Sequence, residues 1–132
     1  MIVADTDVLI DALRGREPGR SWIAGGIASG SLATTAVSLF ELLSGARDAA
    51  EREPVERLLA ALTVLPFDAP AGMAAAEARR ALEAAGKTIG MADYQIAGIC
   101  LSRSAPLLTR NRGQLERVPG LILDDPEGAG SP

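Results

Sequence analysis

The sequence predicts an α/β domain built around a mainly parallel β-sheet. Short apolar runs typical of buried parallel strands alternate with longer segments whose apolar residues have helical spacing. The chain has 132 residues, of which 48% are hydrophobic and 23% charged, and this suffices for one domain with a single core. The alternation fixes the class but leaves the order of the strands in the sheet open.

The first half of the chain supplies three predicted strands and four predicted helices. The strands are short apolar runs at residues 2–4, 32–34 and 63–65. Helical spacing predicts helices over residues 8–13 and 37–46, a weak one around 22–28 that Gly25 and Gly26 interrupt, and one whose buried stripe is Val55, Leu58, Leu59 and Leu62.

The second half continues the alternation. We expect helices over residues 70–85 and 91–102 and strands over 107–109 and 121–123. The domain is therefore expected to span residues 1–123. Residues 124–132 are rich in Gly, Pro and acids, a composition that predicts a flexible tail.

The composition excludes several kinds of chemistry. The chain has no histidine, which removes histidine-based acid–base catalysis and every zinc site that needs a histidine. A single cysteine, Cys100, allows neither an internal disulfide nor a cysteine zinc cluster, and it is expected to be a core residue. With a net charge of −4, the protein lacks the broad basic field of many nucleic-acid-binding proteins, although bound divalent cations can offset this. No apolar run is long enough to span a membrane, so we expect a cytoplasmic protein.

Polar side chains recur where a parallel sheet would present its carboxyl ends, the usual place for a ligand in this class. Asp5 and Asp7 follow the first strand, Glu41 lies near the start of the helix after the second, and Asn111 follows the fourth. Asp93 lies in the first turn of the helix that begins near residue 91. Acids far apart in the sequence are thus expected to converge at one edge of the sheet.

Each of these acids also has an ordinary structural interpretation. Asp5 and Asp7 could be helix N-caps, and Ser38 with Glu41 could form a capping box. Carboxylates that cluster without cationic partners, however, repel one another unless a divalent cation neutralises them. Oxygen ligands of this kind favour Mg²⁺ or Mn²⁺ over zinc.

Four segments in series resemble the motifs of PIN-domain proteins, close to the VapC-type toxins of toxin–antitoxin pairs. They are residues 1–11 (MIVADTDVLID), 38–45 (SLFELLSG), 91–97 (MADYQIA) and 108–111 (LTRN) with 118–121 (VPGL). The match covers nearly the whole chain in the family's order. It implies a three-layer α/β/α fold with a four- to five-stranded sheet.

The resemblance also implies a function: a toxin that is a Mg²⁺- or Mn²⁺-dependent endoribonuclease. Its partners would be RNA and a cognate antitoxin protein, in a homodimer or a toxin–antitoxin hetero-oligomer. Asp5, Glu41 and Asp93 would be the catalytic acids and metal ligands. Asn111 would be a further catalytic residue, although the family often has an acid in this motif, where the chain offers only Asn111 and Gln114.

Five more residues are expected to support this site. Thr6 and Thr109 could orient it by hydrogen bonds, Arg110 and Arg112 could contact RNA phosphates, and Asp7 could supply the charge that Asn111 lacks. Lys87 is more simply a solvated surface residue.

Two other functions stay open from the sequence. In haloacid-dehalogenase-like phosphatases an Asp-x-Asp motif also comes directly after a strand. In this interpretation Asp5 would be the nucleophile and Asp7 the general acid–base. The other motifs would be Thr34, Lys87 and Asp124-Asp125. Glu41 and Asp93 would then have no role. Alternatively, the chain is a non-catalytic PIN-like interaction module, since a fold can outlast its function.

Overall fold

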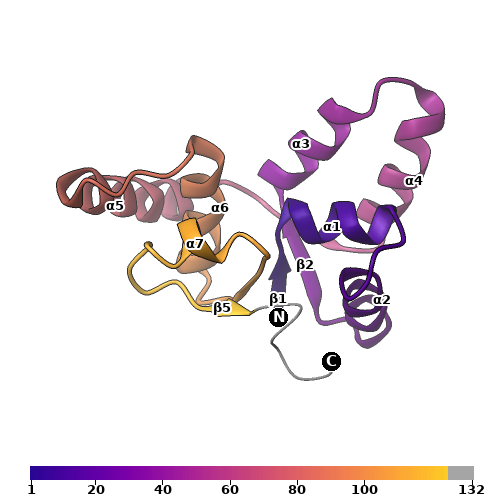
Figure 1. The fold of residues 1–132 in the computed structure, drawn as a ribbon, viewed down its shortest axis with the longest axis horizontal. Coiled ribbons are helices and arrows are strands. Elements are labelled where there is room, and N and C mark those ends of the chain that lie inside the picture. Colours follow the sequence, from indigo (N-terminus) through magenta and orange to yellow (C-terminus); the bar gives the residue numbers. More distant parts are fainter. Residues whose placement is uncertain (125–132) are drawn as a thin grey trace.

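A computed structural model describes residues 1–124 and shows three layers, with a five-stranded parallel sheet in the middle (Figure 1). The strands are Ile2–Ala4 (β1), Leu32–Thr35 (β2), Thr63–Leu65 (β3), Leu107–Leu108 (β4) and Leu123–Asp124 (β5). Their order in the sheet is β3-β2-β1-β4-β5. β1 is central: its Val3 is in register with Ala33 of β2 and Leu107 of β4. The predicted α/β class is confirmed, and the structure supplies the strand order.

Four helices cover one face of the sheet. They are Thr6–Leu13 (α1), Gly19–Ser29 (α2), Ala36–Gly45 (α3) and Ala49–Ala60 (α4). Their apolar side chains join the side chains of Ala4 and Leu108 in one core cluster, together with Val8, Leu9, Ile23, Leu42, Val55 and Leu59. Because neighbouring residues of a strand face opposite sides, Val3 and Leu107 belong to the other layer.

The helices Ala69–Ala85 (α5), Met91–Ser102 (α6) and Arg112–Leu115 (α7) cover the opposite face. Ile96, Ile99 and Cys100 of α6 pack on Val3 and Leu107. α5 lies against α6 on the side away from the sheet (Figure 1) and shares a small cluster with it. The thiol of Cys100 is fully buried, and burial raises its pKa to about 12, as expected of an inert core cysteine.

The structure differs from the predicted elements in detail. α2 is continuous through Gly25 and Gly26. Gly26 is needed here because the helix packs closely on Leu32: a Cβ at position 26 would lie 3.0 Å from the Cβ of Leu32. The four-residue helix α7 was not expected, since one turn is too short to show periodicity. β4 ends one residue early and β5 begins two residues late. Asp124 therefore belongs to β5, and the rest of the predicted tail, residues 125–132, lies outside the described residues.

The topology marks the carboxyl end of β1 as the place for a ligand. From β1 the sheet grows through β2 and β3 on one side and through β4 and β5 on the other. Connections that leave a strand in opposite directions open a crevice at its carboxyl end. Within residues 1–124, no helix is long and apolar enough to cross a membrane.

Candidate active site

Asp5 stands at the carboxyl end of β1 and is 6% exposed. It is the N-cap of α1, as one of the predictions had it, and one of its carboxylate oxygens accepts from the backbone N of Thr6 at 2.8 Å. The other oxygen accepts from the hydroxyl of Thr109 at 2.7 Å. Both bonds come from neutral donors, so the carboxylate is held in place without losing its charge.

Glu41 reaches the same place from α3. Its Oε1 accepts from the hydroxyl of Thr6 at 2.7 Å, and that hydroxyl lies 2.8 Å from the hydroxyl of Ser38. Since a hydroxyl has one proton to donate, Thr6 donates to Glu41 and accepts from Ser38. Thr6 thus contacts both acids, Asp5 through its backbone and Glu41 through its side chain.

The predicted capping box at Ser38 is wrong. Thr35 is the N-cap of α3, and its hydroxyl accepts from the backbone N of Ser38 at 3.0 Å. Ser38 therefore lies inside the first turn, fully buried, where its hydroxyl is available to Thr6. Because Ser38 is not the N-cap, the side chain of Glu41 does not form a capping box with it and instead accepts from Thr6 in the site.

Asp93 approaches from the first turn of α6, opposite α3. Its pKa is raised by burial and, next, by the negative charges of Glu41 and Asp7. Burial also raises the pKa of Asp5 to about 6, and the charges of Asp7 and Asp93 add to this effect. The charges of Glu41 and Asp7 thus act on Asp93, and those of Asp7 and Asp93 act on Asp5, which is consistent with the expected convergence of these acids.

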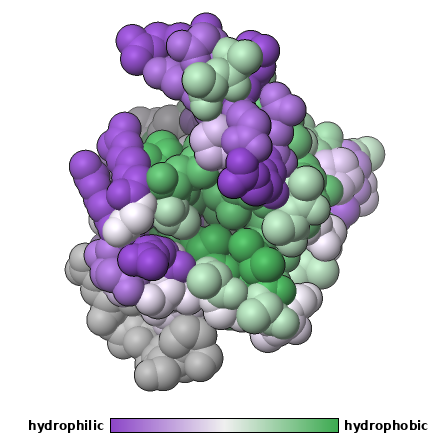
Figure 2. Space-filling model, turned by 90° about the vertical axis from the view of Figure 1, so that its right-hand side faces the viewer, coloured by the Kyte–Doolittle hydropathy of each residue, from purple (hydrophilic) through white to green (hydrophobic). Residues whose placement is uncertain are grey.

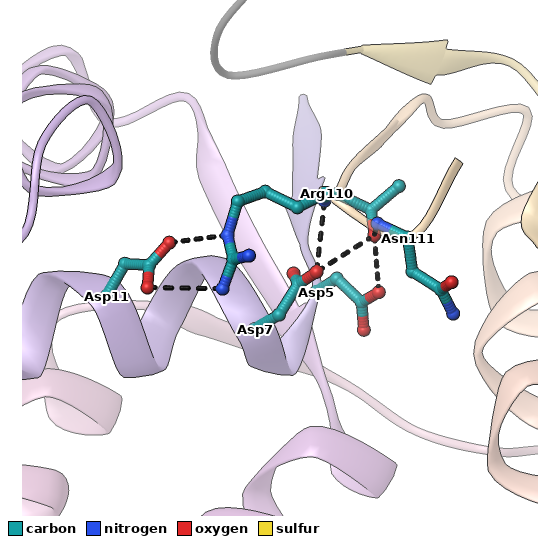
Figure 3. Close-up of polar contacts among 6 residues, drawn as sticks. Asp5, Asp7, Asp11, Arg110 and Asn111 are labelled. Carbon is teal, nitrogen blue, oxygen red and sulfur yellow. Dashed lines mark hydrogen bonds and ion pairs between the residues drawn. The ribbon is translucent and has the colours of Figure 1, made fainter. Parts of the chain in front are cut away.

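Asp7 and Arg110 have partners that the sequence did not suggest (Figure 3). One oxygen of Asp7 accepts from the backbone N of Arg110 at 3.0 Å and lies 3.5 Å from the hydroxyl of Thr109. The guanidinium of Arg110 binds both oxygens of Asp11, with Nε–Oδ2 at 2.6 Å and Nη2–Oδ1 at 3.2 Å. Asp11 was missed by the sequence reasoning, although its spacing of four from Asp7 places both on one face of α1.

The remaining predicted residues lie on the segment after β4. The hydroxyl of Thr109 accepts from the backbone N of Asn111 at 2.9 Å while it donates to Asp5. The side chain of Asn111 is half-buried, and Figure 3 shows it directed away from the contacts of Arg110. Arg112 begins α7 and is half-buried, whereas Gln114 is exposed.

The donor chemistry of the three acids fits a hard divalent cation. As the side chains lie within residues 1–124, no group of three or more acids could hold a metal ion, so binding a cation would require Asp5, Glu41 and Asp93 to move closer together. All their donors are carboxylate oxygens, which suit Mg²⁺ or Mn²⁺, and a cation would offset the burial and the mutual repulsion that raise the pKa values of Asp5 and Asp93. One oxygen of Asp7 is also buried without a hydrogen-bond partner, which adds to the uncompensated negative charge beside Asp5.

The geometry argues against the phosphatase alternative. Its motif needs the hydroxyl of Thr34 to bind a phosphate, but this hydroxyl is fully buried and donates to the carbonyl oxygen of Ala4 at 2.9 Å. Asp124 pairs with Leu108 in the sheet, and Asp125 lies outside the described residues.

The chain is similar to several known proteins. The family model of the PIN domain matches residues 2–121. Ribonuclease VapC10 of Mycobacterium tuberculosis is 38% identical over 111 residues, which cover 84% of this chain and 83% of the relative. The tRNA(fMet)-specific endonuclease VapC of Shigella flexneri is 32% identical over 100 residues, covering 73% and 76% of the two chains. Among solved structures, DNA-bound VapBC from Salmonella typhimurium superposes with a TM-score of 0.84 at 27% identity, covering 95% of this chain and 98% of that one.

Proposed function

Because the chain belongs to the PIN-domain family, we propose that it is a VapC-type toxin: a cytoplasmic, metal-dependent endoribonuclease that a cognate antitoxin holds in check. Relatives that are 38% and 32% identical over most of their length are named as a ribonuclease and an endonuclease. The Shigella relative is named for one tRNA, and the substrate class proposed for this chain is RNA in general.

One observation carries the proposal: Asp5, Glu41 and Asp93 reach the carboxyl end of β1 from three different elements. Thr6 links the first two, with 2.8 Å from its backbone N to Asp5 and 2.7 Å from its hydroxyl to Glu41. The pKa of Asp93 is raised first by burial and then by the charges of Glu41 and Asp7. Burial and neighbouring negative charge both disfavour the ionised forms of Asp5 and Asp93, a pattern that is common at functional sites.

Asp5, Glu41 and Asp93 would hold the divalent cation. When bound, Mg²⁺ or Mn²⁺ lowers the pKa of a coordinated water and polarises a phosphoryl oxygen. The chain's own residues do the rest: Thr6 and Thr109 orient the carboxylates, and Asn111 presents an amide to the substrate. With no histidine to move protons, a carboxylate must accept the proton of the attacking water. Attack by water is expected to leave a 5′-phosphate and a 3′-hydroxyl.

The antitoxin is proposed to cover an apolar groove beside the site. A hollow of about 540 Å³ lies between α1, α3 and α4, and Glu41 lines one part of it. Its apolar walls include Ile10, Leu13, Leu42 and Val55. Figure 2 looks onto the side that carries α1, α2 and α4 and shows apolar residues gathered in a hollow there. The segment around Trp22 lines a separate pocket of about 390 Å³ next to α2.

The test is cleavage of a pool of cellular RNAs by the purified chain in Mg²⁺ or Mn²⁺, with a chelator in parallel. Asp93→Asn removes one acid of the site, and Glu77→Gln is its matched control, because this carboxylate on α5 is 81% exposed. We expect metal-dependent cuts with 5′-phosphates for the wild type and the control but not for Asp93→Asn.

Two outcomes would overturn the proposal. Equal cleavage by wild type and Asp93→Asn would assign the activity to a contaminant. Intact RNA, together with no heat of Mn²⁺ binding by calorimetry, would indicate the non-catalytic interaction module instead.

A further inference from the structure

We propose that Asp11 and Arg110 form a positioning pair: their ion pair holds the segment 109–111 against α1 and so keeps Thr109 and Asn111 in place beside Asp5. Arg110 then acts within the protein rather than by binding RNA phosphates. The inference rests on the proposed ribonuclease function.

α1 contacts Arg110 at several points. Asp7 accepts from the backbone N of Arg110 at 3.0 Å, and Asp11 accepts from two nitrogens of its guanidinium at 2.6 and 3.2 Å. The two acids are one helical turn apart and lie on the same face of α1. Main chain and side chain of Arg110 are therefore both fixed to α1, across 99 or more positions of sequence.

Asp11 is more deeply buried than the acids of the surface ion pairs. Its side chain is 9% exposed and that of Arg110 is 42% exposed, whereas the partners in ion pairs such as Arg79–Glu83 are about half exposed. α2 covers Asp11 closely: a Cβ at Gly19 would lie 2.9 Å from the Cβ of Asp11, so only glycine fits there without a shift. A bidentate, partly desolvated pair defines orientation far better than a surface pair.

Arg110 lies in the chain between two residues of the site, Thr109 and Asn111. Thr109 donates to Asp5 at 2.7 Å, and the backbone N of Asn111 donates to Thr109 at 2.9 Å. Asn111 is uncharged, so its attraction to the acids of the site is weak and contacts within the protein must set its position. Fixing the residue between Thr109 and Asn111 fixes both, and the ion pair affects catalysis through them.

The test compares Asp11→Asn and Arg110→Lys with the wild type, with Glu83→Gln as the matched control from the exposed pair on α5. Arg110→Lys keeps the charge but loses the bidentate geometry. We expect each variant to lower kcat on a cleavable RNA about tenfold or more, since small displacements at a site have effects of this size. KM should stay close to that of the control, and the variants should remain folded at the temperature of the assay even where their Tm falls. A double variant should be no worse than the single ones, because both changes break the same contact.

An RNA-binding role for Arg110 predicts the opposite pattern and would overturn the inference. Asp11→Asn would then release the guanidinium and lower KM, while Arg110→Lys would raise KM with kcat unchanged. A loss of kcat that only follows the unfolded fraction would also overturn it.

Amide hydrogen exchange separates this inference from the proposed function. Both variants should speed exchange at the backbone N of Arg110 and Asn111, whether or not the wild type cleaves RNA, whereas Glu83→Gln should not. Unchanged exchange in an active enzyme refutes the positioning pair alone. If the wild type does not cleave RNA but amide exchange is faster in the two variants, the proposed ribonuclease function is refuted. The ion pair then remains a contact that holds the segment 109–111.

Discussion

Replacing Asp5 with asparagine should stabilise the metal-free protein while it abolishes cleavage. Burial, followed by the charge of Asp7, raises the pKa of Asp5 from its ordinary value of 3.8 to about 6. This difference corresponds to about 3 kcal/mol by which ionised Asp5 destabilises the fold. The asparagine side chain would keep an acceptor for the backbone N of Thr6 but would lack the charge that strengthens the bond from Thr109, an effect of about 1–2 kcal/mol. We therefore expect a net gain of about 1–2 kcal/mol at neutral pH.

The gain should depend on pH with a definite sign. The folded protein binds the proton of Asp5 more tightly than the unfolded chain does, so wild-type stability falls as the pH rises from about 4 through about 6. Above this range the full penalty is present, and below it Asp5 is neutral in both states. The advantage of Asp5→Asn should thus be greatest near pH 8 and vanish below about pH 4.

Thermal unfolding followed by circular dichroism in a chelator measures this directly. For a chain of this length, 1–2 kcal/mol corresponds to a rise in Tm of about 3–8 °C. Glu77→Gln, which removes an exposed carboxylate, controls for the general effect of one negative charge. A variant no more stable than the control at pH 8, or with the same advantage at pH 4 and pH 8, would refute the reasoning. Added Mg²⁺ should raise the Tm of the wild type but not that of Asp5→Asn.

Two further predictions concern the site and the packing behind it. Glu41→Gln should reduce RNA cleavage by about a hundredfold or more because it removes the charge of one acid of the site. It should not lower the Tm, because this carboxylate is exposed and glutamine keeps an oxygen for the Thr6 hydroxyl. A labelled-RNA assay measures the first effect and a thermal unfolding curve the second. Gly98→Ala should destabilise the fold by about 2 kcal/mol or more, because the new Cβ would lie 2.4 Å from the carbonyl oxygen of Ala71. Gly113→Ala is the control, because a Cβ at that position meets nothing within 4 Å. Equal midpoints of urea unfolding for the two variants would contradict the expectation.

The sequence was sufficient to place the acids but not their partners. The positions of Asp5 and Glu41 follow from strand ends and helix starts, which local periodicity reveals. The ion pair of Asp11 with Arg110 joins residues 99 positions apart, and no local pattern encodes such a contact. The roles expected for Asp7 and Arg110 were assigned from charge alone, and the structure gives both residues partners in the protein.

The capping box at Ser38 failed for a related reason. Two residues near the start of a predicted helix, Thr35 and Ser38, can each act as N-cap, and the sequence offers no means of choosing between them. In the structure β2 runs on to Thr35, so α3 begins directly after it and Ser38 is carried inside the first turn. The pairing of β2 with β3 sets where β2 ends, and this end in turn determines the position of Ser38 in the site.

The allocation of charged partners separates the acids that hold the structure from those that serve the site. Asp11 receives the guanidinium of Arg110, which neutralises its charge, whereas Asp7 receives only a backbone N–H from the same arginine. The hydrogen bonds of Asp5 and Glu41 come from Thr6 and Thr109, which orient a carboxylate without neutralising it. Hydroxyl and amide donors thus leave negative charge available where an arginine would cancel it. The guanidinium of Arg110 binds Asp11 of α1, and the negative charge of the other acids is what a divalent cation is proposed to compensate.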